Sequence, residues 1–204
     1  MPANTTPFEI IAAPFTIWIA PVAEAFPDLD TDPPGGNWTK VGTNGDLNYS
    51  DAGVTISHAQ SMNFWRALGD AGSRKVFRQE EDLMIRVEMV DVSLEGYTEA
   101  LHRQTPADVA AGSGTVGYKT IGLSRGLSVP TTALLVRGPS PYLDGEFSQY
   151  EVPIAAQSGS PEPVYRRDEP AMLALEWTAL VDTGAANEFE RFGRLRAADA
   201  AALP

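Results

Sequence analysis

The chain has 204 residues, an apolar fraction of 43%, a formal net charge of −12 and no cysteine. This length and apolar content fit a single domain over residues 1–204 that buries one core. The lack of cysteine excludes disulfides, thiolate zinc sites and cysteine nucleophiles, and the acidic balance disfavours binding to a nucleic-acid backbone.

The N-terminal region contains one apolar segment and one long loop. Residues 15–22, FTIWIAPV, are apolar on both faces of an extended chain and predict a buried strand. A signal peptide would need a basic region before such a run, but Glu9 precedes it and the first basic residue is Lys40. Residues 23–37 contain Pro-Pro-Gly-Gly, which supports no regular element, so we expect a loop there.

The next part of the chain predicts a polar β-meander and a hairpin. Residues 38–56, WTKVGTNGDLNYSDAGVTI, read as strand, turn, strand, turn and strand because glycine, asparagine and aspartate separate short β-prone pieces. Residues 68–75 predict a long polar hairpin loop. The strand DLMIRVEMVD then alternates between two faces. Its apolar face carries Leu83, Ile85, Val87 and Met89, and its polar face carries Asp82, Arg86 and Glu88.

The hydrophobic period then changes from two residues to that of a helix, which we expect over about residues 94–103. In SLEGYTEALHR the apolar residues Leu94, Tyr97 and Leu101 fall on one helical face, which should pack on the sheet. Ser93 is a favourable N-cap residue. The sequence therefore predicts a mainly β fold, a β-sandwich or barrel, with one flanking α-helix.

The C-terminal half predicts further strands. Residues 104–169 are long enough to add an extra hairpin or an inserted subdomain. In LALEWTALV an apolar face is formed by alternate residues, and Glu176 lies on the opposite face. The tail after Asp182 contains NEFERFGRLRAADAAA, for which we expect partly helical structure interrupted at Gly193.

Motifs that would carry chemistry are weak in this sequence. Residues 112–117, GSGTVG, match a dinucleotide-binding fingerprint, but a β-prone segment follows where a helix is needed. Residues 28–32 place aspartate at alternate positions, but the later glycine and glutamate of a calcium loop are missing. The two histidines, His58 and His102, lack a nucleophile motif beside them. We therefore expect no catalytic residues, no cofactor and no metal.

The order of the segments resembles the major tail tube proteins of long-tailed bacteriophages. The resemblance rests on WTKVGTNGDL followed by DAGVTI, on DLMIRVEMVD running directly into SLEGYTEAL, and on LALEWTALVD followed by a Phe-Gly pair. It covers roughly residues 36–103 and 170–196. The same fold serves contractile tails and secretion tubes.

The resemblance implies a structural virion protein. Six copies of such a subunit join into a ring, and the rings stack into a tube that conducts DNA into the host. The implied partners are further copies of the chain, tape-measure protein and tail-terminator protein, with DNA passing unbound and no membrane contact. Assembly would take place in the host cytoplasm. Of the polar strand residues, Asp82, Arg86, Glu88 and Glu176 would face the lumen, and Arg74 and Lys75 would contact the adjacent ring.

Two other functions fit the sequence. The chain could be another β-rich particle component, such as a tail terminator or a carbohydrate-binding module. It could also be an enzyme whose two carboxylates meet on folding. Stacked hollow rings of one diameter would distinguish the tube subunit from both.

Overall fold

The computed structural model describes residues 11, 13–101 and 104–200. Ten strands, one α-helix and two short 3-10 helices are present in these residues. The strands are β1 (Thr16–Pro21), β2 (Thr39–Lys40), β3 (Tyr49–Trp65), β4 (Lys75–Met89), β5 (Ala107–Val109), β6 (Tyr118–Thr120), β7 (Thr131–Pro139), β8 (Phe147–Gln157), β9 (Leu173–Ala179) and β10 (Arg194–Ala197). The helices are η1 (Gly45–Asn48), α1 (Leu94–Ala100) and η2 (Glu188–Glu190). The predicted mainly β fold with one flanking α-helix is confirmed.

One antiparallel sheet organises the body of the molecule. Its order is β2-β1-β7-β8-β9-β4-β3, and β10 pairs with β8. The sheet encloses the main core, because inward residues of β1 and β7 meet those of β4 and β9 in one apolar cluster. The alternation predicted for DLMIRVEMVD is confirmed, since Leu83, Ile85, Val87 and Met89 are all buried. None of the described helices has the length and hydrophobicity to cross a lipid bilayer.

Strand β1 is buried on both faces, as its sequence predicts. Ile17 and Ile19 belong to the main core, whereas Trp18 and Ala20 belong to a second apolar cluster. The second cluster is covered by the loop at residues 23–37, in which Phe26 packs on Trp38 with ring centroids 5.3 Å apart. This loop is free of regular secondary structure, as expected.

Helix α1 packs on the sheet through smaller residues than we expected. The Ser93 hydroxyl accepts a hydrogen bond from the Gly96 N–H, which confirms the predicted N-cap. Gly96 and Ala100 are the buried residues of the helix. Leu101, the next residue after the helix, is also buried. Leu94 and Tyr97 are only half-buried. A Cβ at residue 96 would lie 3.2 Å from Met89 Cε, so glycine lets the helix approach the core closely. Residues 102–103 lie outside the described chain.

Three other predictions need correction or refinement. The middle strand of the predicted meander is wrong: residues 45–48 form η1, and β3 runs unbroken from Tyr49 past a register shift before Val54. The partly helical tail is confirmed only for the short 3-10 helix η2 before Gly193, because residues 194–197 form β10 on the edge of β8. Residues 104–169 contain an additional hairpin, β5–β6, and also two central strands of the main sheet, β7 and β8.

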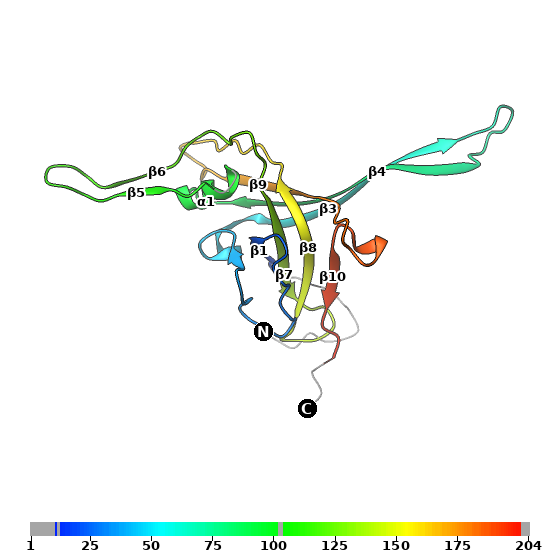
Figure 1. Cartoon of the computed structure of the whole chain (residues 1–204), viewed down its shortest axis with the longest axis horizontal. Coiled ribbons are helices and arrows are strands. Elements are labelled where there is room, and N and C mark those ends of the chain that lie inside the picture. The colour runs from blue at the N-terminus through cyan, green and yellow to red at the C-terminus, as the bar shows by residue number, and fades with distance from the viewer. Residues whose placement is uncertain (1–10, 12, 102–103, 201–204) are drawn as a thin grey trace.

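Two hairpins leave the body on opposite sides. The β3–β4 hairpin forms a long ribbon at one end of the longest axis, and the β5–β6 hairpin projects from the other end, beyond α1 (Figure 1). The predicted hairpin loop is confirmed, since β3 ends at Trp65 and β4 begins at Lys75.

Candidate assembly surfaces

The four residues expected at a lumen lie on the face of β4 and β9 that points away from the core. Arg86 pairs in register with Glu176 across the two strands. Its Nη2 also lies 2.6 Å from Glu88 Oε1. Asp82 is farther along β4, opposite Ala59 of β3, and is exposed. The fold therefore brings Arg86, Glu88 and Glu176 together on one polar surface, with Asp82 toward the ribbon.

The far end of the β3–β4 ribbon, residues 62–78, is called the ribbon tip below. Every residue of the ribbon tip except Ala67 is exposed. The register places Met62, Phe64 and Val76 on the face that continues the core face of the sheet. These three side chains are exposed by 42%, 55% and 49%. Large apolar groups on a two-stranded ribbon are typical of a surface that another molecule covers.

The opposite face of the ribbon tip is aromatic and basic. It carries Trp65 and Phe77, which are exposed by 54% and 48%. Lys75 Nζ lies 5.0 Å from the centroid of the Phe77 ring, within reach of a cation–π interaction. Lys75 also pairs in register with Trp65, so the three side chains form one patch.

The hairpin loop of the ribbon tip is closed by its own polar contacts. Arg74 N–H donates to the Trp65 carbonyl, and Arg74 Nε donates to Asp70 Oδ2 at 2.8 Å. The Arg74 guanidinium, with help from the Gly72 N–H, holds the pKa of the Asp70 carboxyl below its usual value. Arg74 and Lys75, the residues expected at an inter-ring contact, therefore sit at the base of this loop.

The β5–β6 hairpin is attached to α1 by an ion pair. Lys119 Nζ lies 2.6 Å from Glu95 Oε1, and both side chains are more than half exposed. This contact lowers the pKa of Glu95 and raises that of Lys119. The glycine fingerprint at residues 112–117 lies at the tip of this hairpin, where Gly112 and Thr115 form a bridge. It connects two strands instead of a strand and a helix, which is not the geometry of a dinucleotide site.

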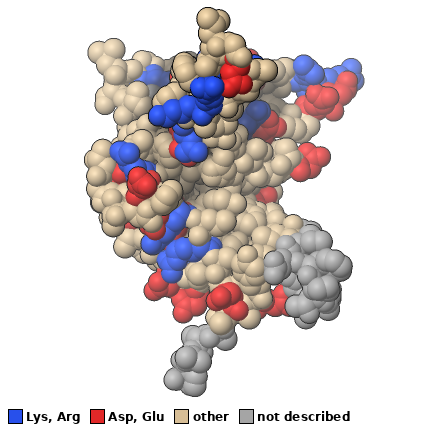
Figure 2. Space-filling model, turned by 90° about the vertical axis from the view of Figure 1, so that its right-hand side faces the viewer, with Lys and Arg blue, Asp and Glu red and all other residues tan. Residues whose placement is uncertain are grey.

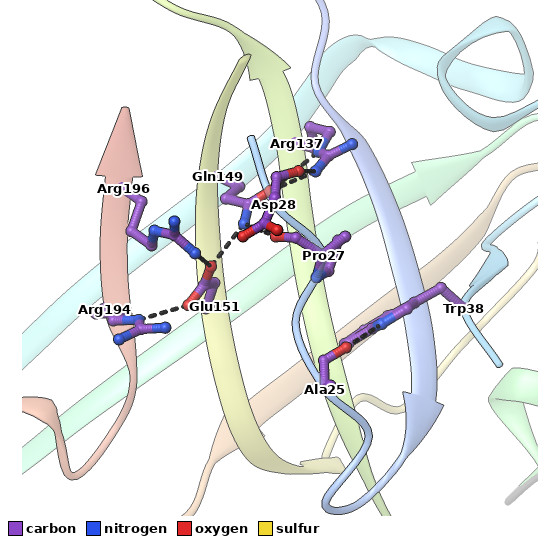
Figure 3. Close-up of polar contacts among 9 residues, drawn as sticks. All are labelled: Ala25, Pro27, Asp28, Trp38, Arg137, Gln149, Glu151, Arg194 and Arg196. Carbon is purple, nitrogen blue, oxygen red and sulfur yellow. Dashed lines mark hydrogen bonds and ion pairs between the residues drawn. The ribbon is translucent and has the colours of Figure 1, made fainter. Parts of the chain in front are cut away.

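A buried polar cluster on β8 was not predicted from the sequence. Glu151 is 1% exposed. Its two carboxylate oxygens accept from Arg194 Nε at 2.5 Å and from Arg196 Nη1 at 3.0 Å, both on β10 (Figure 3). Gln149 Nε2 donates to the same carboxylate at 2.6 Å. The ion pair with Glu151 raises the pKa of Arg194.

The cluster continues through Gln149 to the N-terminal loop. Gln149 Oε1 accepts from Arg137 Nε at 3.0 Å and from Nη2 at 2.7 Å. Arg137 also donates to the backbone carbonyl of Asp28 (Figure 3) and to that of Thr31. Burial lowers the pKa of Arg137, and nearby carboxylates oppose this effect. The cluster fastens the loop at residues 23–37 to β7 and β8, and it fastens strand β10 to β8. An arginine inside the apolar run TTALLVRG was the available sequence signal.

The described residues contain no candidate metal centre. Among them, no group of three or more His, Cys, Asp or Glu side chains could hold a metal ion. Asp28 contributes only its backbone carbonyl to the cluster above. His58 pairs in register with Leu83 where the ribbon leaves the body. His102 lies outside the described residues.

Two of the clefts formed by the described residues border the main sheet. One, of about 580 Å³, lies between the ribbon at Arg78–Glu81 and the segment that contains η2. The other, of about 420 Å³, lies between residues 39–43 and residues 89–99 and is called the helix cleft below. A scan against protein-family models found no match to this chain, and a search of curated proteins also found no match.

Proposed function

We propose that this chain is a structural subunit that assembles into rings, and that the rings stack into a tail tube for the passage of DNA. The observation that carries the proposal is the exposed ribbon tip, whose apolar and aromatic side chains find no cover within the described chain. The resemblance to tail tube proteins adds the hexameric ring, the tape-measure and tail-terminator partners and the virion location.

The shape of the ribbon favours self-association over a monomeric state. An isolated two-stranded hairpin is at best marginally stable in water, because neither of its faces is packed. Strand β3 is also the last strand of the sheet, so its outer edge has no partner strand among the described residues. Exposed strand edges invite pairing with another chain, and closure of copies into a ring would remove them.

The polar face of β4 and β9 has a role in this proposal. Glu88 and Glu176 would recur in every copy around the lumen. Negative groups repel DNA phosphates, so DNA would slide through the tube without binding. Arg86 pairs in register with Glu176 and contacts Glu88, so its positive charge would weaken the negative potential of this face.

A deletion of the ribbon tip tests the proposal. Ser61 and Glu80 are paired in register, so residues 62–79 can be replaced by Asn-Gly, which forms a tight hairpin turn. The core residues Leu83 and Ile85 remain in place. We expect wild-type protein to form rings or tubes as its concentration rises, by sedimentation velocity and electron microscopy, and the deletion variant to stay monomeric.

A thermal unfolding curve provides the control. The deletion variant should unfold within a few degrees of the wild type, because the removed residues are not part of the core. A wild-type chain that remains monomeric at high concentration would contradict the proposal. Rings of normal size from the deletion variant would show that the ribbon tip is not the contact.

A further inference from the structure

We infer that the ribbon tip of one copy docks against the helix cleft of the next copy, in a head-to-tail contact guided by opposite charge. This inference rests on the proposed self-assembly and names the two surfaces that meet. It depends on three features of the described chain: the charge of the ribbon tip, the charge of the helix cleft, and their positions on the molecule.

The ribbon tip is a basic element of an acidic chain. It contains Arg66, Arg74, Lys75 and Arg78 against one acidic residue, Asp70, a net charge of +3. Because the whole chain carries −12, the other residues together carry −15. Seen from the ribbon end, the surface presents several groups of Lys and Arg side chains, with Asp and Glu side chains among them (Figure 2). A second copy of the chain is therefore a partner of suitable charge, and like-charged contacts elsewhere would be disfavoured.

The helix cleft supplies the matching charge. Three acidic residues, Asp91, Glu95 and Glu99, and one basic residue, Lys40, line the helix cleft, a net charge of −2. Glu95 lies on α1 and forms an ion pair with Lys119. Its side chain remains more than half exposed in this pair. The recess of about 420 Å³ can admit an aromatic side chain, and Trp65 and Phe77 are the exposed aromatic groups of the opposing ribbon tip.

The ribbon tip and the helix cleft lie well apart on the molecule. The ribbon extends from one end of the longest axis, and α1 lies toward the other (Figure 1). A contact between different surfaces of identical chains is heterologous, so it leaves one ribbon tip and one helix cleft free for the next copies. Repetition of this contact produces either a closed ring or a filament, according to the rotation between neighbours.

Charge reversal on each surface gives a paired test. One variant carries Arg74→Glu and Lys75→Glu, and the other carries Glu95→Lys and Glu99→Lys. In each variant alone, the two surfaces have the same sign. We expect each to associate at least about tenfold more weakly than wild type, from the loss and reversal of several surface charge pairs. In an equal mixture, each contact joins opposite charges, so assembly should return.

A matched control uses acidic residues elsewhere. Asp28→Lys with Asp30→Lys makes the same change in net charge on the exposed loop at residues 23–37. We expect this variant to assemble like wild type and to give no rescue when mixed with the ribbon variant. Thermal unfolding checks that all three variants are folded, and sedimentation velocity measures their association.

The outcomes separate this inference from the proposed function. Wild-type protein that never associates contradicts both. Wild-type assembly combined with normal assembly of the Glu95/Glu99 variant, or with no recovery in the mixture, overturns the helix cleft as the docking surface and leaves self-assembly standing. Recovery with the Asp28/Asp30 variant in its place would assign the contact to that loop.

Discussion

Removal of the two arginines that bind Glu151 should destabilise the fold much more than neutralisation of Glu151 itself. The reason is an asymmetry of exposure. The Glu151 side chain is 1% exposed, whereas Arg194 and Arg196 are 48% and 34% exposed. If the arginines are truncated, the carboxylate remains buried with Gln149 as its remaining side-chain partner. If Glu151 becomes Gln, the guanidinium groups can turn to water.

The magnitudes follow from these environments. A buried ion pair that loses one partner costs about 3–5 kcal/mol, because an uncompensated charge is left in the interior. We expect Arg194→Ala with Arg196→Ala to reach about that range. Glu151→Gln removes hydrogen bonds to charged groups that are partly solvated, so about 1–2 kcal/mol is expected after allowance for screening. Typical domains are stable by only about 5–15 kcal/mol, so the difference is large enough to measure.

Urea unfolding followed by circular dichroism gives both free energies, and the slope of each transition checks that unfolding remains cooperative. Hydrogen exchange adds a local measurement: the β10 amides should lose protection in the double-arginine variant first, because β10 is held to β8 by four residue pairs. If the double-arginine variant costs no more than Glu151→Gln, then water reaches the Glu151 carboxylate and the asymmetry argument is wrong.

Three further predictions concern the helix, the entry to β10 and the polar sheet face. Leu101→Ala removes a buried side chain after α1 and should cost about 2–5 kcal/mol in urea unfolding; a change under about 0.5 kcal/mol would mean that the helix end is not docked. Gly193→Ala should detach β10, because φ is +120° and a Cβ would lie 2.0 Å from the Glu151 carbonyl oxygen; unchanged exchange of the β10 amides would refute this. Glu88→Lys with Glu176→Lys should leave ring formation intact but slow DNA ejection, most strongly at about 0.01 M salt where the Debye length is about 30 Å; equal ejection rates at all salt concentrations would place these residues outside the lumen.

Local sequence signals predicted the parts of the fold that depend on near neighbours. The alternation in β4 identified its buried face because successive strand residues point to opposite sides. Ser93 identified the start of α1 because its hydroxyl needs a partner only three residues away. The loop at residues 23–37 was predicted from Pro-Pro-Gly-Gly. Proline has no backbone N–H to donate to a strand or helix, and glycine disfavours both.

The buried polar cluster could not be predicted in the same way. Its ion pairs join residues 43 and 45 positions apart, and Arg137 reaches a carbonyl 109 positions away. The segment Arg194–Ala197 contains helix-favouring arginine, leucine and alanine, so its local propensity disagrees with its strand conformation. Pairing with β8 and the two bonds to Glu151 outweigh that propensity. Long-range pairing also decides the place of two strands within residues 104–169. Strands β7 and β8 lie between β1 and β9 in the main sheet.

The distribution of charge connects the body of the protein with its proposed assembly. A chain at −12 repels its own copies, which favours solubility and opposes association in most orientations. The ribbon tip, at +3, reverses the sign at one end only, and it extends beyond the body so that it meets a neighbour first. At physiological ionic strength the screening length is about 8 Å, so this attraction acts only when the ribbon tip comes close to an acidic surface. Orientation is therefore selected at short range, and the exposed aromatic and aliphatic side chains of the ribbon tip can then bury surface to hold the contact.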